Sequence, residues 1–289
     1  MKAFFVVNPT AGKKRALTIW NRLKTLIDIP YEFALTKSPG QATEIAREAV
    51  KAGYGKIVAV GGDGTVREVV QALSHSEACL GVIPAGTGND FIRSVGIPSE
   101  PKRALEIIKN GNVRRIDLLR AGDNFFVNVV GAGLDAEVAD AVNKSVRFFN
   151  GTLTYLVQLM KVLTVYTTRD VTIEIDGKTV KRRAWLVSVG NARYYGGGMM
   201  ICPDALVDDG FLVVCIVNEI SKAELLRFLP CVFSGKHKNH PAYEVLKGKK
   251  VKIKFAPPAK VHADGDVIGV TPVEFSVEPG ALKVLTWKA

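Results

Sequence analysis

The stretch Ile57-Val58-Ala59-Val60-Gly61-Gly62-Asp63-Gly64-Thr65 combines a short apolar run with a loop that has three glycines in four residues. A continuous apolar run of this length is typical of a buried strand in a parallel sheet. The glycines indicate a backbone that adopts left-handed torsion angles or that a ligand approaches closely. Apolar residues at helical spacing follow over residues 66–73. The stretch therefore predicts a strand, a tight loop and a helix.

The same alternation of strand and helix patterns runs through residues 1–120, which predicts an α/β domain with a parallel sheet. Residues 281–289 form a last strand pattern that could complete this domain or pair elsewhere. Residues 121–280 carry short strand patterns and few helical ones, with an Asp176-Gly177 hairpin signal. They predict a second, β-rich domain of antiparallel, sandwich-like layers.

Composition narrows the class of protein. The net charge of +11 over 289 residues favours anionic partners such as nucleotides or acidic lipid headgroups. The four cysteines show no zinc or disulfide spacing, which indicates a reducing compartment. The first apolar run is too short for a signal peptide, and no run is long enough to span a membrane. We expect a cytoplasmic protein. Aromatic residues do not interleave the basic ones, so nucleic acid is not expected as the partner.

Two more small-residue loops follow apolar strands in the first domain. The first is Asn8-Pro9-Thr10-Ala11-Gly12, and the other is Pro84-Ala85-Gly86-Thr87-Gly88-Asn89-Asp90. Either alone could be an ordinary turn. The carboxyl ends of parallel strands meet at one edge, so the Gly61 and Gly86 loops, on neighbouring strands, are expected to converge there. Small-residue loops at helix N-termini can also cradle phosphate groups. Asp63 and Asp90 suit Mg²⁺, which prefers hard oxygen ligands.

Together the three loops resemble those of a family of lipid kinases that includes bacterial diacylglycerol kinases and sphingosine kinases. The motifs are Asn8 to Gly12, Gly61 to Thr65 and Gly86-Thr87-Gly88-Asn89-Asp90-Phe91. A GGDG loop alone is shared with NAD kinases and phosphofructokinases, whereas its combination with GTGNDF is more specific. The resemblance covers nearly the whole chain. It implies an NAD kinase/diacylglycerol kinase-like fold and an ATP-dependent kinase acting on a lipid hydroxyl, such as that of diacylglycerol.

The resemblance also implies roles for single residues. The nucleotide would contact Asn8, Pro9, Thr10, Ala11, Gly12, Thr36, Gly61, Gly62, Asp63, Gly64, Thr65, Thr87 and Asn89. The catalytic Mg²⁺ would lie on Asp63, Asp90 and Asp117. A departure from the family is Arg67, because the family usually has Asn at this position.

Two motifs of the second domain match the family as well. Asp209, with the carbonyl groups of Leu206 and Phe211, would hold a structural metal ion; an Asp-Asp-Gly turn is the simpler alternative. A kinase acting on an alcohol needs an acceptor for the hydroxyl proton. Asp264-Gly265-Asp266 stands where the family carries a DGE-type motif, so Asp264 is the expected base, with Asp266 beside it. The same Asp-Gly pair is also a preferred hairpin turn.

The residues that could bind a lipid are marked less specifically in the sequence. Apolar residues around residues 148–163 could line an acyl-chain cleft or form ordinary core: Phe148, Phe149, Leu153, Tyr155, Leu156, Leu159, Met160 and Leu163. Basic residues could contact anionic lipids or form a solvated face: Lys236, His237, Lys238, Lys247, Lys249, Lys250, Lys252 and Lys254. We expect peripheral contact with a membrane surface that presents the lipid substrate. A homodimer is one option for the assembly.

Two alternatives to a lipid kinase remain. An NAD kinase would share the GGDG loop, although GTGNDF and the late Asp264-Gly265-Asp266 motif fit it less well. A non-catalytic nucleotide-binding regulator would retain the phosphate cradle, but it would have no need of the acidic pair.

Overall fold

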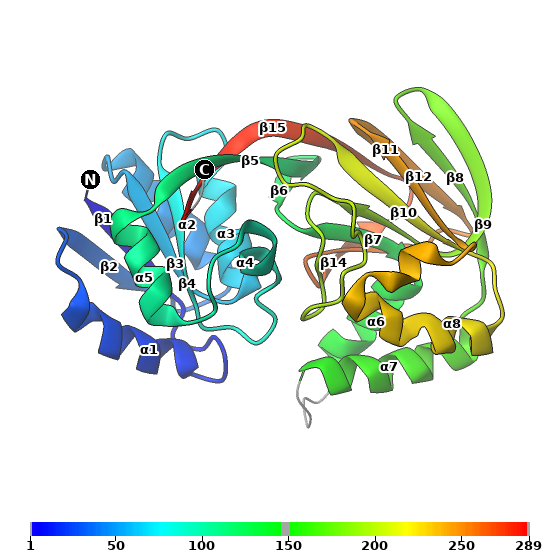
Figure 1. Ribbon diagram of the computed structural model, residues 1–289, viewed down its shortest axis with the longest axis horizontal. Helices are drawn as coiled ribbons and strands as arrows, with labels where there is room; N and C mark the ends of the chain where they lie inside the picture. Colours follow the sequence, from blue (N-terminus) through cyan, green and yellow to red (C-terminus); the bar gives the residue numbers. More distant parts are fainter. Residues whose placement is uncertain (1, 146–150, 288–289) are drawn as a thin grey trace. The chain divides into compact units, whose positions relative to one another are not determined.

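The computed structural model describes residues 2–145 and 151–287. The chain divides into two compact units (Figure 1). Unit 1 comprises Met1–Leu118 and Glu278–Ala289, and unit 2 comprises Leu119–Val277. Within the described residues, no helix has the length and apolarity needed to cross a membrane.

Unit 1 contains a parallel sheet in the strand order β2-β1-β3-β4, extended by the end of β15. The strands are β1 (Ala3–Val7), β2 (Tyr31–Leu35), β3 (Lys56–Gly61), β4 (Cys79–Pro84) and β15 (Val273–Thr286), and β5 (Asn112–Ala121) pairs with β15. Central strands β3 and β4 are buried almost throughout, as expected for a parallel sheet covered on both faces. The last predicted strand is the end of β15, and it pairs with β4 through Lys283 and Val284.

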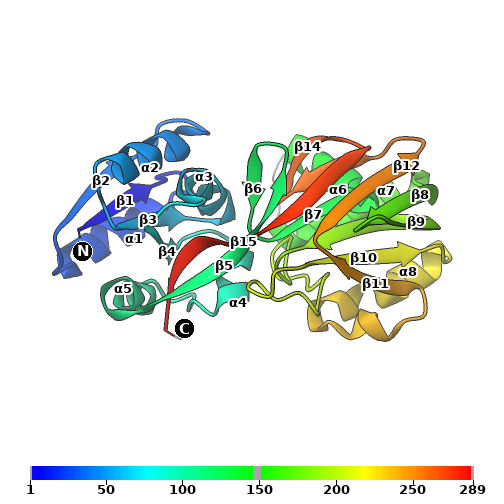
Figure 2. The same ribbon diagram turned by 90° about the horizontal axis from the view of Figure 1, so that it is seen from above.

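The helices of unit 1 cover its sheet. They are α1 (Arg15–Leu23), η1 (Lys24–Leu26), α2 (Gln41–Lys51), α3 (Asp63–Leu73), α4 (Asp90–Val95) and α5 (Pro101–Asn110). α2 packs on α3, and α1 packs on α5. Figure 2 shows α2 and α3 on one side of the strands and α5 on the other. Buried Val66, Val69, Val70 and Leu73 form the apolar stripe of α3, which confirms the predicted helix.

Unit 2 is built from antiparallel strands in the order β14-β13-β7-β9-β8-β12-β15, with β10 pairing to β9 and β11 to β10. The strands are β6 (Asn124–Phe126), β7 (Val129–Gly133), β8 (Arg169–Ile175), β9 (Lys178–Gly190), β10 (Leu212–Asn218), β11 (Tyr243–Gly248), β12 (Lys250–Ala256), β13 (Lys260–Ala263) and β14 (Asp266–Val270). The first half of β9 pairs with β8, and its second half lies between β7 and β10. This confirms the predicted antiparallel, β-rich region.

The core of unit 2 lies on the inner faces of these strands. Successive side chains of a strand point to opposite faces. In β12, Val251, Ile253 and Phe255 are therefore buried, and the lysines between them are exposed. The helical segments are α6 (Leu134–Lys144), α7 (Gly151–Val165), α8 (Lys222–Phe228), η2 (Leu229–Ser234) and η3 (Lys236–Asn239). Helical spacing around residues 152–165 and 223–229 predicts α7 and α8. No such pattern marks α6, because acidic residues interrupt its buried stripe.

Candidate active site

The three small-residue loops of unit 1 touch one another at the carboxyl ends of β1, β3 and β4. A Cβ atom added to Gly12 would lie 2.0 Å from the carbonyl oxygen of Ala85. A Cβ atom added to Gly86 would lie 2.5 Å from the Cα atom of Gly62. No side chain fits in such gaps, so these positions need glycine for a close approach of backbones. The loops converge, as the alternating strand pattern predicts.

Hydrogen bonds fasten the same loops together. The main-chain N–H of Ala85 donates to the carbonyl oxygen of Gly61 at 2.8 Å. The Nδ2 of Asn8 donates to the Oγ1 of Thr65 at 3.1 Å. Thr36, which follows β2, is tied to β1 because its N–H donates to the carbonyl oxygen of Val7 at 2.9 Å. Helix α3 begins within this cluster, and the partial positive charge at its N-terminus suits a phosphate group.

The polar residues of the loops divide into anchors and exposed groups. The N–H and Oγ1 of Thr10 both donate to the Oδ1 of Asn8, at 3.1 and 2.9 Å. The Nδ2 of Asn89 donates to the carbonyl oxygen of Gly86 at 3.2 Å, which braces its own loop. Gly64 and Thr87 are exposed. The anchors shape the loops, and the exposed positions are the ones that a ligand can reach.

Asp264 and Gly265 form a two-residue hairpin turn in unit 2. Ala263 pairs with Asp266 across the turn, and the φ angles of Asp264 and Gly265 are 48° and 93°. Both positive values are those of a type I′ turn. The carboxylate oxygens of Asp264 are shielded from solvent, whereas Asp266 is exposed at the start of β14. The two acids of the motif therefore have different surroundings.

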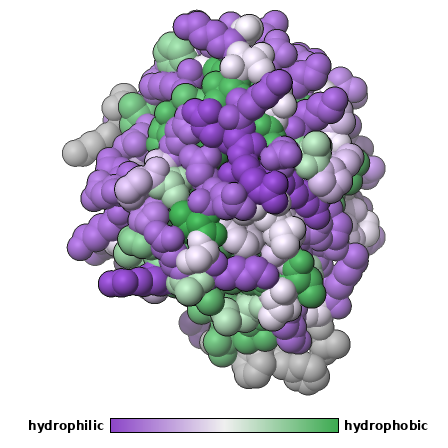
Figure 3. Space-filling view, turned by 90° about the vertical axis from the view of Figure 1, so that its right-hand side faces the viewer, coloured by the Kyte–Doolittle hydropathy of each residue, from purple (hydrophilic) through white to green (hydrophobic). Residues whose placement is uncertain are grey.

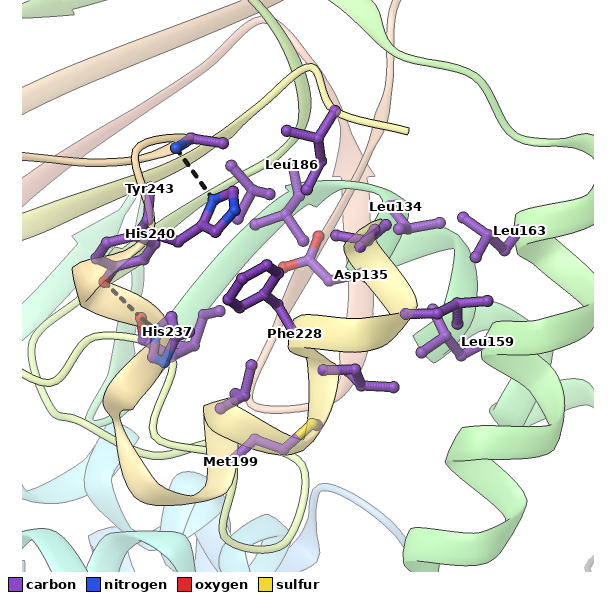
Figure 4. A pocket seen from close by; sticks show the side chains of 18 of the residues that line it. Leu134, Asp135, Leu159, Leu163, Leu186, Met199, Phe228, His237, His240 and Tyr243 are labelled. Carbon is purple, nitrogen blue, oxygen red and sulfur yellow. Dashed lines mark hydrogen bonds between the residues drawn. The ribbon is translucent and has the colours of Figure 1, made fainter. Parts of the chain in front are cut away.

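Unit 2 also contains an apolar pocket, drawn from close by in Figure 4. The empty space in it is about 790 Å³ when the open solvent at its mouth is counted. The wall is mostly aliphatic and aromatic, and α6, α7, α8, η2 and η3 all contribute to it. Its main members are Leu134, Tyr155, Leu159, Leu163, Leu186, Met199, Leu226, Phe228 and Val232. Asp135, His237 and His240 are polar exceptions, and burial raises the pKa of the Tyr155 hydroxyl.

Comparison with known proteins agrees with this architecture. Residues 2–121 match the diacylglycerol kinase catalytic domain, and residues 128–286 match the YegS C-terminal NAD kinase beta sandwich-like domain. The diacylglycerol kinase of Mycobacterium tuberculosis (strain H37Rv) is 34% identical over 251 residues, which cover 84% of this chain and 81% of the relative. That of Bacillus subtilis (strain 168) is 31% identical over 283 residues, which cover 95% and 92%. The chain belongs to the diacylglycerol kinase family.

A solved structure also resembles this member of the diacylglycerol kinase family. The crystal structure of a putative diacylglycerol kinase from Bacillus anthracis str. Sterne superposes with a TM-score of 0.82 at 27% identity. The match covers 98% of this chain and 94% of that chain. The family resemblance, the two-part fold class and the kinase class of enzyme that the sequence predicts are therefore confirmed.

The family expectation of a magnesium site concerns Asp63, Asp90 and Asp117, all in unit 1. The Oδ1 of Asp63 accepts the N–H of Phe91 at 3.1 Å. Asp90 is buried, and its Oδ1 lies 3.4 Å from the Nη1 of Arg93. The Oδ1 of Asp117 accepts the N–H of Gly280 at 2.8 Å. Among the residues that the structure describes, no three acidic, histidine or cysteine side chains are close enough to form a metal site by themselves.

These carboxylates still fit Mg²⁺ as a cofactor shared with phosphate. Asp63 and Asp90 are brought to adjoining loops by the Asp63–Phe91 hydrogen bond. Mg²⁺ commonly takes only one or two protein carboxylates and completes its shell with waters and substrate phosphates. The part of Asp117 in such a site stays a prediction. Arg67 lies in the second turn of α3, half-buried.

The Asp209 carboxylate, the expected ligand of a structural metal ion, has two partners within the protein. The Oδ1 of Asp209 accepts the N–H of Phe211 at 3.0 Å, and the Nζ of Lys247 lies 2.7 Å from its Oδ2. Lys247 and Lys249 also stand over the Phe211 ring, at 4.9 and 5.4 Å from its centroid. The carboxylate and the carbonyl groups of Leu206 and Phe211 are hard donors that suit a cation. Such a cation would compete with the Lys247 ammonium, so this site also stays a prediction.

The predicted lipid-facing residues of α7 do not share one surface. Tyr155, Leu159 and Leu163 line the pocket, whereas the side chains of Leu153 and Met160 are about half exposed. Phe148 and Phe149 lie outside the described residues. The sequence does not indicate that α6, α8 and η2 form walls of this pocket, because these segments are distant in sequence. Gly133-Leu134-Asp135, where β7 ends and α6 begins, is the local signal that could have indicated Asp135.

The predicted basic cluster is spread over several elements. Lys250, Lys252 and Lys254 alternate along the exposed side of β12, while Lys238 pairs with Asp204 at 3.0 Å. His237 is not part of a charged face, because it is buried and burial lowers its pKa. The face in Figure 3 is mostly hydrophilic with smaller apolar areas. A basic surface is present, but its histidine member is part of the interior.

Proposed function

We propose that this protein is an ATP-dependent lipid kinase that transfers the γ-phosphoryl group to a lipid hydroxyl, with diacylglycerol as the first candidate substrate. The observation that carries the proposal is the backbone contact of the three small-residue loops around the N-terminus of α3. Such an arrangement supplies N–H groups and a helix dipole to phosphates without side chains in the way. Relatives named diacylglycerol kinase support the choice of lipid.

In this proposal unit 1 binds the nucleotide. The phosphates lie over Gly61 to Thr65 and Thr87, Asn8 and Thr36 border them, and Asp63 with Asp90 holds Mg²⁺. When bound, Mg²⁺ would neutralise charge on the β- and γ-phosphates. The chain's own contribution is to orient the phosphates through loops that are already bonded together, which lowers the cost of ordering them.

Unit 2 supplies the proton acceptor. The lipid oxygen forms a bond to the γ-phosphorus, the bond from that phosphorus to the bridging oxygen of ADP breaks, and the hydroxyl proton passes to Asp264. The shielded carboxylate of Asp264 suits a base that must act away from bulk water, whereas Asp266 is exposed. The apolar pocket of unit 2 is the proposed site for an acyl chain, because its wall is nearly free of charge.

Access to the lipid is proposed to occur at a membrane surface. Exposed Leu153 and Met160 on α7 can insert modestly, and the net charge of +11 favours anionic headgroups. Lipid turnover should therefore be faster on vesicles that contain phosphatidylserine than on neutral phosphatidylcholine vesicles. Equal rates on both would remove the anionic-lipid part of the proposal.

The deciding experiment incubates the protein with labelled ATP, Mg²⁺ and a panel of diacylglycerol, a sphingoid base, a polyprenol and NAD. We expect label in a lipid. The matched variant is Asp63→Asn, which keeps an acceptor for the Phe91 N–H but removes the charge. It should melt like the wild type and lose about 100-fold or more in kcat, the size of effect that one electrostatic group at a reacting centre can have.

The other outcomes separate the alternatives. Label in NAD would identify an NAD kinase. Nucleotide binding without transfer to any acceptor would identify a non-catalytic regulator. Wild-type turnover by a folded Asp63→Asn variant would remove Asp63 from the magnesium site.

The structural cation at Asp209 is tested by melting. If a cation binds there, Mg²⁺ should raise the melting temperature, a chelator should lower it, and Asp209→Ala should abolish the difference. Lys247→Met removes the competing ammonium group and should enlarge the effect of the cation. A wild-type melting temperature that is the same with metal and with chelator would count against the site.

A further inference from the structure

Helix α6 holds the β13–β14 hairpin at three points along its length. At its start, the Oδ2 of Asp135 lies 3.3 Å from the Nε2 of His262 on β13. In its middle, Glu137 and Asp140 both bind the Nζ of Lys260, at 2.6 and 2.7 Å. At its end, the Nδ2 of Asn143 donates to the carbonyl oxygen of Gly265 at 3.0 Å. One rigid element thus binds both the strand that leads to Asp264 and the turn that contains it.

The Asp135 contact is built into the sheet. Ser188, Gly131 and His262 stand in one row across β9, β7 and β13. The carboxylate of Asp135 lies over the central glycine and is bonded to the residues on both sides, with the Oγ of Ser188 at 3.2 Å. A Cβ atom on Gly131 would lie 1.9 Å from the Oδ2 of Asp135. The glycine is therefore required for this contact.

Keeping a carboxylate at this place is costly. Asp135 and His262 are each only 1% exposed. Burial penalises a carboxylate even when it has good hydrogen-bond partners, which offsets much of what those partners contribute to stability. The contact therefore provides little net stability, but it fixes one arrangement of the strand. Asp135 also lines the apolar pocket (Figure 4).

We propose that Asp135 and Asn143 are positioning residues for the turn that carries Asp264, which they hold through His262 and the Gly265 carbonyl group. This inference rests on the proposed lipid kinase function, since Asp264 is the proposed proton acceptor there. Neither residue touches the reacting atoms. A displacement of the base by about 1 Å can cost on the order of 100-fold in rate, so these contacts affect kcat rather than nucleotide binding.

The test compares variants of Asn143, whose side chain is exposed. Asn143→Asp has the same shape but presents an acceptor to the Gly265 carbonyl oxygen, and it should lower kcat for lipid about tenfold. KM for ATP and the melting temperature should stay near their wild-type values. Asn143→Gln retains a donor and should recover most of the rate. Arg103→Met, which removes an exposed ion pair with Glu100 at the start of α5, is the control and should have no effect.

Asp135→Asn provides a second, buried variant, for which we expect a larger fall in kcat. Amide hydrogen exchange of residues 262–268 is measured in parallel and should speed up in Asn143→Asp. Wild-type kcat and unchanged exchange in a folded Asn143→Asp would overturn the inference while leaving the lipid kinase proposal intact. A wild-type protein that phosphorylates no lipid would instead overturn the proposed function, and the positioning role in that reaction would fall with it.

Discussion

Unit 2 contains two Asp-Gly hairpin turns with nearly the same backbone. Asp176-Gly177 joins β8 to β9, and Asp264-Gly265 joins β13 to β14. The φ angles are 48° and 83° in the first turn and 48° and 93° in the second. Both pairs satisfy the same local requirement, a left-handed conformation at two successive residues.

The two carboxylates differ in what surrounds them. Asp176 lies on an exposed turn and accepts the main-chain N–H groups of Lys249 and Lys250, the latter at 2.8 Å. Those hydrogen bonds, with Lys250 first, lower the pKa of the Asp176 carboxyl, so it joins two strands as a charged acceptor. The Asp264 carboxylate is shielded from solvent, and its turn is held by α6. The dipeptide determines the turn, but the surrounding structure determines what the aspartate does.

The largest expected effect comes from removing the charge of each aspartate in turn. Asp264→Asn should lower kcat for lipid by about 100-fold or more, because a positioned general base contributes that much. Asp176→Asn should keep wild-type kcat and melt a few degrees lower, since an amide oxygen is a weaker acceptor than a carboxylate. Turnover and melting curves are measured for both variants.

The pair is informative because each variant is the control for the other. Comparable losses of activity in both would mean that the turns are equivalent and that Asp264 has no special role. If Asp264→Asn is fully active while Asp266→Asn is not, the base is the exposed acid of the motif.

The same contrast shows how far sequence reasoning reaches. Both turns and the alternation of lysine with apolar residues along β12 follow from local rules, so they are predictable. The convergence of the unit 1 loops is predictable because parallel strands end at one edge. The row of Ser188, Gly131 and His262 is not predictable, since three distant strands must first pair before Asp135 can lie over the glycine.

Local patterns do not show which partner a polar group finds far away in the sequence. Asp117 is a predicted magnesium ligand, and its carboxylate also accepts the N–H of Gly280, 163 positions away. Asp209 is a predicted metal ligand, and it also pairs with Lys247 from β11. Their partners come from strand pairing, which a single sequence does not specify.

The smallest expected effect, and the sharpest comparison, comes from the glycines of the two turns. Gly177→Ala and Gly265→Ala place a Cβ atom in open space at a left-handed position, so each should cost about 1–2 kcal/mol of conformational energy and no more. The melting temperatures should therefore fall by similar amounts. Activity should not fall equally, because a small distortion beside Asp264 displaces the proposed base, whereas one beside Asp176 displaces only a surface turn. We expect a roughly tenfold lower kcat for Gly265→Ala, within the range for misplaced groups, and wild-type kcat for Gly177→Ala. Equal kcat in two variants that have lost equal stability would show that the position of the Asp264 turn does not limit the reaction.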